Sequence, residues 1–186
     1  MFRSLFRGRD DVFPKRWENP KTGKAGYAPA CANEWAPHIC GKPKVKCGGC
    51  PHSAFLSVTD DVIDGHLRGY HTVGVYPLLV DDTCWFLAVD FDKATWKDDS
   101  AALLQTCAGR DIPATLERSR SGQGGHVWIF FAERVPASVA RRLGVHLVTE
   151  TMERNPDIGF SSYDRFFRDG RTSADRYGAL HRRRLR

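Results

Sequence analysis

The chain contains no run of about 18 consecutive apolar residues, the length that a membrane-spanning helix needs, so we expect no membrane segment. Its first residues, 1–13, carry charges throughout and no apolar stretch, which argues against a secretory signal. Internal repeats are also lacking. With 186 residues, 41% of them hydrophobic, the sequence is typical of one soluble globular domain with at most a small appendage, and we expect it in the cytoplasm.

Most of the chain lacks an excess of positive charge, although the net charge is +6. Residues 1–164 carry 20 Lys and Arg against 20 Asp and Glu, and the last 22 residues hold eight Arg and two Asp. The tail over 168–186 shows no apolar periodicity, which predicts disorder. Residues 1–50 carry ten basic and four acidic side chains, and residues 51–164 carry ten basic and sixteen acidic ones. The front segment therefore suits phosphates and the middle suits cations, unless both are simply solvated charge.

Four of the six cysteines lie close together, at Cys31, Cys40, Cys47 and Cys50, with 8, 6 and 2 residues between them. Without a secretory signal, a disulfide framework is not expected. Four thiolates can bind Zn²⁺ tetrahedrally, and the two glycines of the last pair permit the tight turn of a zinc knuckle. A structural Zn²⁺ would supply folding energy to residues 1–50, which are expected to have little core of their own.

Other arrangements of the cysteines stay open. The four thiols could remain reduced without a metal, or a histidine, His38 or His52, could replace one of them as a ligand. Cys84 and Cys107 stand apart from the cluster, in a predicted strand and a predicted helix, where a buried free thiol is expected.

Hydrophobic periodicity predicts an α+β fold, a sheet with helices on one face. Residues 1–50 are rich in Pro, Gly, Lys and Asn and predict irregular structure. The predicted helices are Val58–Leu67, Asp98–Ala108 and Ala137–Arg154. The predicted strands are Thr72–Val80, Cys84–Asp92, Ala114–Glu117, His126–Phe131 and Ser161–Phe167. The first two strands are expected to form a hairpin, and the longest helix to bury a stripe of Val139, Leu143, Leu147 and Met152.

Two carboxylates end the predicted strand that runs to Asp92. Asp90 and Asp92 are two residues apart, so their side chains point to the same face of the strand, with Cα atoms about 6.5–7 Å apart. Such a pair suits Mg²⁺ or Mn²⁺, because hard cations prefer oxygen ligands. The alternative is a strand end whose acids merely face water.

A glycine-rich loop, Ser119–Gly125, leads into the strand that begins at His126. Glycine lets backbone N–H groups approach phosphate oxygens, and arginine offers a two-pronged donor for them. A histidine at a strand start is otherwise a common surface or core residue. The predicted triphosphate-binding residues are Arg118, Arg120, Ser121, Gly124 and His126. With the acid pair, they predict metal-dependent nucleotidyl transfer.

The N-terminal segment mixes cations with aromatic side chains, a combination that suits phosphate contact and base stacking. A folded scaffold with a charged surface is an equally good interpretation. The residues are Lys15, Arg16, Trp17, Lys21, Lys24, Tyr27 and Trp35.

Taken together, these motifs resemble the archaeo-eukaryotic primase superfamily, the primase–polymerases, and within it the primase domain of TOTE conflict systems. The resemblance covers roughly residues 6–167, and several motifs match in order. The matching stretches are Phe6–Trp17, the cysteine cluster, Gly74–Leu79, Phe86–Asp92, Glu117–Trp128 and Ser162–Arg165.

The resemblance implies template-directed synthesis of a primer or DNA strand from nucleoside triphosphates. It implies that Asp90 and Asp92 bind the catalytic metals, that Asp164 is the third acid, with Asp169 a weaker candidate, and that Ser121 and His126 contact the triphosphate. The expected partners are DNA template and primer, nucleoside triphosphates, and a helicase or nuclease. The expected organisation is a zinc-binding segment over 1–57, a primase–polymerase core with an RRM-like unit over 58–167, and a tail over 168–186.

The sequence departs from this family after Phe167. Members usually continue with Phe-Pro-x-Gln and a glycine-rich apolar strand, whereas this chain continues with Arg168–Arg171 and the arginine-rich tail. That continuation is what a truncation or a shift of reading frame would leave. Two other functions therefore stay open: a zinc-stabilised module that binds nucleic acid without catalysis, and a metal-dependent nuclease.

Overall fold

The computed structural model describes residues 2–92, 94–155 and 163–165. Its contacts divide the chain into two compact units, residues 1–81 and residues 82–170, which are described separately below. The domain boundary predicted between residues 57 and 58 stays a prediction. Within the described ranges, every helix is too short or too polar to cross a membrane.

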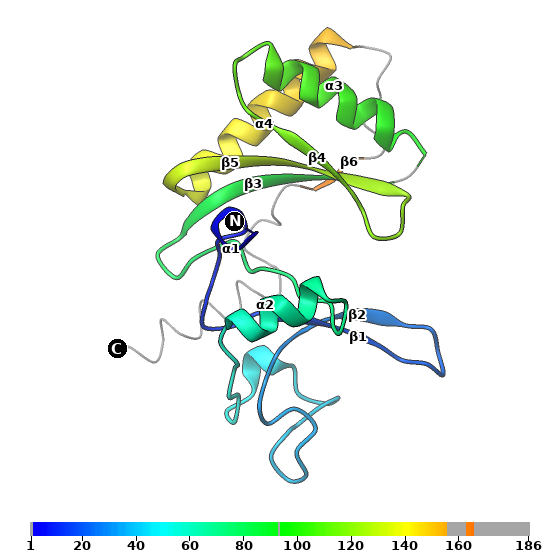
Figure 1. Ribbon diagram of the computed structural model, residues 1–186, viewed down its shortest axis with the longest axis vertical. Coiled ribbons are helices and arrows are strands. Elements are labelled where there is room, and N and C mark those ends of the chain that lie inside the picture. The colour runs from blue at the N-terminus through cyan, green and yellow to red at the C-terminus, as the bar shows by residue number, and fades with distance from the viewer. Residues whose placement is uncertain (1, 93, 156–162, 166–186) are drawn as a thin grey trace. The chain divides into compact units, whose positions relative to one another are not determined.

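The second unit contains a four-stranded antiparallel sheet with the strand order β4-β5-β3-β6. The strands are β3 (Thr83–Asp92), β4 (Thr115–Arg118), β5 (Gly124–Pro136) and β6 (Tyr163–Arg165). Two helices, α3 (Trp96–Ala108) and α4 (Ala137–Arg154), cover one face of this sheet (Figure 1). The predicted α+β class, with helices on one face, is confirmed.

Alternate side chains of β3 point into the hydrophobic core of this unit. Leu87, Val89 and Phe91 are almost completely buried and pack with residues of β5, α3 and α4, among them Leu103 and Leu147. Each such side chain contributes roughly 1.5–3 kcal/mol on burial. The opposite face of β3 therefore carries the other set of side chains, which ends in Asp90 and Asp92, as predicted.

Helix α4 begins after Pro136 and ends at Arg154, as predicted, but the predicted apolar stripe was partly wrong. Val139 and Met152 are 41% and 45% exposed. The buried face contains residues that lie three, four or seven positions from Leu147: Ala140, Gly144 and Thr151. The buried face of α4 thus includes small residues beside Leu147.

The first unit contains an antiparallel hairpin within the segment that was predicted to be irregular, and that prediction was wrong here. Its strands are β1 (Pro14–Glu18) and β2 (Ala25–Pro29), and its other elements are α1 (Phe2–Leu5), η1 (Cys47–Gly49) and α2 (Asp60–Leu67). The turn closes because Asn19 bonds to Lys24 across it and Gly23 adopts φ +66°. Helix α2 was predicted, and Thr59 caps it by accepting a hydrogen bond from the Val62 amide.

The hairpin predicted between Thr72–Val80 and the strand that ends at Asp92 does not form. The only described β-pairing of residues 72–80 is an isolated bridge from Val73 to Lys15. The segment instead lies alongside residues 9–16 of the N-terminal segment. The amide of Gly74 donates to Pro14, and Tyr76 accepts from the amide of Arg9. Strand β3 pairs with β5 and β6 instead. The β-rich composition of residues 72–80 reflects packing within the first unit, which local propensity does not reveal.

Cys84 and Cys107 are buried free thiols, as predicted. Burial raises the pKa of both thiols, because the thiolate loses its hydration in an apolar site. Both therefore act as small core residues.

Candidate active site

The two acids at the end of β3 lie opposite the start of β5. Asp90 pairs with His126 and Asp92 pairs with Gly124 in the antiparallel register. The Asp90 side chain is 34% exposed, and Asp92 is exposed. The predicted acid pair and two of the predicted nucleotide-binding residues therefore meet at one end of the sheet.

Gly124 leaves the space that the Asp92 carboxylate occupies. A Cβ atom at this position would lie 2.7 Å from Asp92 Oδ1 and 2.7 Å from the backbone oxygen of Phe91, closer than real Cβ contacts. The next residue, Gly125, has a similar role on the helix side, where a Cβ atom would lie 2.9 Å from the ring of Trp96. The glycine pair lets β5 pass between an acid on one face and an indole on the other.

His126 lies between two carboxylates. Its Nε2 is 3.4 Å from Asp90 Oδ1, and its Nδ1 is 3.3 Å from Glu117 Oε2. The same Glu117 oxygen accepts a hydrogen bond of 2.9 Å from Trp128 Nε1, and the rings of Trp128 and His126 meet in a T-shaped arrangement with centroids 5.9 Å apart. Glu117 and Trp128 thus hold the imidazole with one nitrogen directed at Asp90.

Glu117 was not among the predicted site residues. Its role depends on the register of β4 against β5, which places Glu117 directly opposite His126. Trp128 lies two residues after His126 and therefore on the same face of β5, beside Glu117 on the paired strand. The sequence gives this relation only once the length of the turn between β4 and β5 is known.

The predicted phosphate loop is the turn of the β4–β5 hairpin. Gly122 adopts φ +74°, and its carbonyl accepts hydrogen bonds of 3.2 and 3.1 Å from Nε and Nη2 of Arg118. The hydroxyls of Ser119 and Ser121 lie 3.1 Å apart. Arg120 and Ser121 are exposed at the turn. Arg118 therefore shapes the turn, while the residues at its tip face solvent.

The predicted third acid, Asp164, lies in β6, which runs along the opposite edge of β3. The register pairs Asp90 with Arg165 and Phe91 with Tyr163, with an irregularity between the two pairs. The backbone of Asp164 therefore runs beside the acid end of β3. The side chain of Asp164, and the whole of Asp169, lie outside the described residues.

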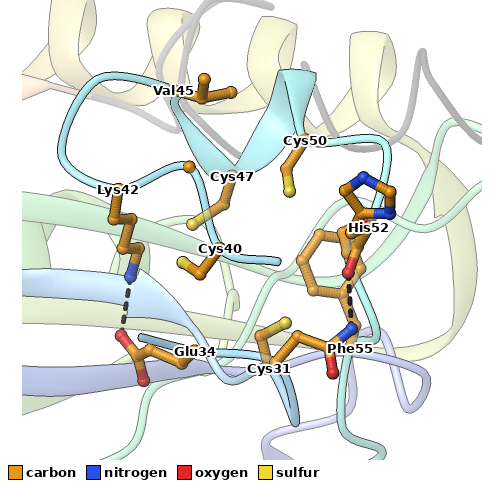
Figure 2. A pocket seen from close by; sticks show the side chains of 12 residues that line it. Cys31, Glu34, Cys40, Lys42, Val45, Cys47, Cys50, His52 and Phe55 are labelled. Atoms are coloured by element: carbon orange, nitrogen blue, oxygen red, sulfur yellow. Dashed lines mark hydrogen bonds and ion pairs between the residues drawn. The ribbon is translucent and has the colours of Figure 1, made fainter. Parts of the chain in front are cut away.

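The four clustered cysteines line one pocket in the first unit (Figure 2). Three of them, Cys40, Cys47 and Cys50, come from the loop around η1, and Cys31 follows β2. His52, one of the alternative ligands, also lines the pocket. Among the residues that the structure describes, no three His, Cys, Asp or Glu side chains are grouped as a metal site.

A lysine borders this pocket. Lys42 Nζ lies 2.6 Å from Glu34 Oε1. Burial lowers the pKa of Lys42, but the hydrogen bond to Glu34 and the neighbouring Cys47 outweigh it, so the pKa of Lys42 is raised. The pocket thus places a permanent cation beside a thiol.

The sequence model described as the TOTE conflict system, archaeo-eukaryotic primase domain, matches residues 1–178, a range that continues past Phe167. No curated protein matches the chain.

Proposed function

We propose, since this chain belongs to the TOTE conflict system archaeo-eukaryotic primase domain family, that it is a metal-dependent nucleotidyltransferase which extends a DNA strand on a template. Family membership supports transfer of nucleotides in general. The observation that carries the proposal is the position of Asp90 and Asp92, which end the same strand and lie opposite His126 and Gly124. This arrangement places cation ligands and phosphate-binding groups side by side.

The acid pair fits Mg²⁺ or Mn²⁺, because carboxylate oxygens are the ligands that these hard cations prefer. Asp90 and Asp92 would hold the ions together with Asp164 from the neighbouring strand. When bound, such ions stabilise the negative charge that develops on the attacking and leaving oxygens.

The β4–β5 turn and His126 would bind the triphosphate of the incoming nucleotide. Arg120 and Ser121 are exposed at the turn, and the backbone at Gly124 can approach a phosphate closely because no side chain intervenes. Arg118 maintains the turn through its two bonds to Gly122. Catalysis by these residues consists of positioning and charge neutralisation.

The cysteine pocket is proposed to hold a structural Zn²⁺. Four thiolates are a soft, closed ligand set of the kind that structural zinc sites use, and Cys47 and Cys50 flank a one-turn helix. A Zn²⁺ with four thiolates would carry a net charge of −2, and Lys42, which bonds to Glu34, would also lie beside the thiolate of Cys47. The reduced, metal-free cluster is the alternative, and zinc analysis decides between them.

Primer extension tests the proposed activity. A labelled primer–template with Mg²⁺ or Mn²⁺ and nucleoside triphosphates should be extended by the wild-type chain and about 100-fold or more slowly by Asp90→Asn, because the variant loses a charged metal ligand. Asp98→Asn, an exposed acid in the first turn of α3, is the matched control and should keep wild-type activity. Extension by Asp90→Asn at the wild-type rate would refute the assignment.

Two other outcomes identify the alternatives. Shortening of the labelled strand that Asp90→Asn abolishes would indicate a nuclease. Binding of DNA without extension or shortening would indicate a non-catalytic module. A helicase or nuclease partner and a cytoplasmic location stay predictions.

A further inference from the structure

The hairpin of β1 and β2 extends away from its base as a ribbon (Figure 1). The base is held by residues 72–74, since the amide of Arg16 donates to Thr72 and the amide of Gly74 donates to Pro14, both at 2.8 Å. Beyond that base every residue from Trp17 to Ala25 is exposed. The proposed catalytic residues do not include any part of this ribbon.

The ribbon carries an excess of positive charge. Residues 14–29 contain four basic side chains and one acid. The acid, Glu18, bonds at 2.8 Å to Arg16, which cancels that pair. Lys15, Lys21 and Lys24 remain, and all three are exposed. The ribbon therefore presents three cations to solvent.

The indole of Trp17 lies close to Gly26 on the facing strand of the ribbon. Trp17 pairs with Gly26, where a Cβ atom would come within 3.0 Å of the indole, so glycine makes this position of the ring possible. The side chain of Trp17 is 45% exposed. Lys15, two residues before it, lies on the same face of the strand, while Tyr27 pairs with Arg16 on the other.

We propose that this ribbon binds single-stranded nucleic acid, with a base stacked on Trp17 and phosphates contacted by Lys15, Lys21 and Lys24. A lone exposed aromatic residue is common and would carry no argument. Here the indole lies against Gly26, stays 45% exposed, and shares its ribbon with three exposed lysines, while the one acid of the ribbon is paired with Arg16. An aromatic surface among cations is what binding of a single strand requires. The choice of partner rests on the proposed function, because a polymerase must hold a template strand.

The test measures binding of the full chain to a fluorescein-labelled oligothymidylate of about 12 nucleotides by fluorescence anisotropy. Trp17→Ala should weaken binding at least about fivefold, and Trp17→Phe should restore part of the loss, because a ring remains for stacking. Tyr70→Ala is the matched control, since Tyr70 is 78% exposed and lies outside the ribbon, and its binding should equal that of the wild type. Equal affinity of Trp17→Ala and the wild type would overturn the proposal.

The salt dependence separates local contacts from overall charge. Lys21→Ser/Lys24→Ser should reduce the slope of log affinity against log salt by about 1.4, the value for two lost phosphate contacts with a single strand. Arg141→Ser/Arg142→Ser removes the same charge from an exposed part of α4 and should leave the slope unchanged. Equal slopes in the two double variants, or tighter binding of a duplex than of the single strand, would also overturn the proposal.

Asp90→Asn distinguishes the failure of this inference from the failure of the proposed function. It should bind the oligothymidylate as the wild type does while it fails to extend a primer. Binding that depends on Trp17 in a wild-type chain that cannot extend a primer would refute the polymerase assignment alone. Extension together with binding that is insensitive to Trp17 would refute the ribbon alone.

Discussion

At the scale of single residues, the contacts around His126 define a positioning role for Glu117. Glu117 accepts from Trp128 and faces Nδ1 of the imidazole, so it fixes the ring with Nε2 directed toward Asp90. Carboxylate partners of functional histidines orient the ring and select its tautomer. In the proposed function Glu117 is neither a metal ligand nor a phosphate ligand, and it acts through His126.

If His126 binds the triphosphate as proposed, Glu117→Ala should raise KM for the nucleoside triphosphate about tenfold and change kcat less, because the variant loses the orientation of His126. Glu117→Gln keeps an acceptor for Trp128 and should recover most of the loss. Steady-state kinetics with varied nucleoside triphosphate measures both. A uniform loss of activity that follows a lower melting temperature in both variants would mean that Glu117 only stabilises the fold.

The positions of the candidate site residues were partly predictable from the sequence. The face that carries Asp90 and Asp92 follows from the period of two along a strand, and the structure confirms it. The proximity of these acids to His126 and Gly124 requires the register of β3 against β5, which no local pattern contains. Arg118 as a phosphate ligand stays a prediction. Its hydrogen bonds to the carbonyl of Gly122 depend on the conformation of the turn, which residue type alone does not specify.

At the scale of elements, α3 and α4 are joined by a cluster of charges at one end. The side chain of Glu150, on α4, is 9% exposed and bonds to Arg110, which follows α3, and to Arg154. His146 also faces this carboxylate, at 3.8 Å. The hydrogen bond from Arg110 is the main reason that the pKa of Glu150 is lowered, with further contributions from the nearby positive charges.

Because the pKa of Glu150 is lower in the folded than in the unfolded chain, the carboxylate contributes stability at neutral pH. That contribution is lost as the pH falls below about 4.5, the ordinary value for a glutamate, toward the folded value. The urea midpoint of Glu150→Gln should therefore be lower than that of the wild type at pH 7, and the difference should shrink with acidification. A difference that stays constant between about pH 7 and pH 3 would show that the charge is not responsible.

Helices were predicted best where an amphipathic period coincides with a residue that marks the start of the helix. Helix α4 follows Pro136 and has the predicted bounds. Helix α2, capped by Thr59, ends at Leu67 as predicted but begins at Asp60, two residues after the predicted start. The wrong hairpin over residues 72–80 shows the limit of this approach. Its β-branched and aromatic residues suit a strand, but the pairing partner for this segment is the N-terminal segment, and composition does not specify a partner.

At the scale of the whole molecule, the two units have separate sources of stability. The buried cluster around Leu103 and Leu147 consists only of residues of the second unit. The cysteine pocket belongs wholly to the first unit. Loss of a metal from that pocket is therefore expected to act on one unit.

The purified chain should contain about one equivalent of zinc, the content of a single Cys₄ site. Removing the zinc with a chelator should accelerate amide hydrogen exchange across residues 25–58, while the strands and helices of the second unit keep their protection, and Cys47→Ser should behave like the chelated protein. Cys84→Ser is the control, because this buried thiol lies outside the pocket and should not alter zinc content. Well under one equivalent of zinc, together with unchanged exchange in Cys47→Ser, would refute the zinc site.

The family was recognisable from the sequence because several short motifs recur in order, and the match over residues 1–178 confirms it. The division into compact units at residues 81 and 82 was not predicted. It depends on contacts such as those between Arg3 and Asp60, which are 57 positions apart, and between the Val58 amide and the Asp10 carbonyl. Long-range contacts of this kind decide where α2 belongs, and they leave no periodic trace in the chain.

Strand β6 has a consequence for the chain during its synthesis. It follows α4 in sequence, yet it pairs with β3 beside Asp90, so β3, β5 and both covering helices leave the ribosome before this strand does. In that interval the acid end of β3 exposes backbone N–H and C=O groups that have no partner strand, a known starting point for aggregation. Strand β6, the last strand in the described part of the chain, thus also protects the nascent sheet, and chains released before Tyr163 are expected to associate with one another through the exposed edge of β3.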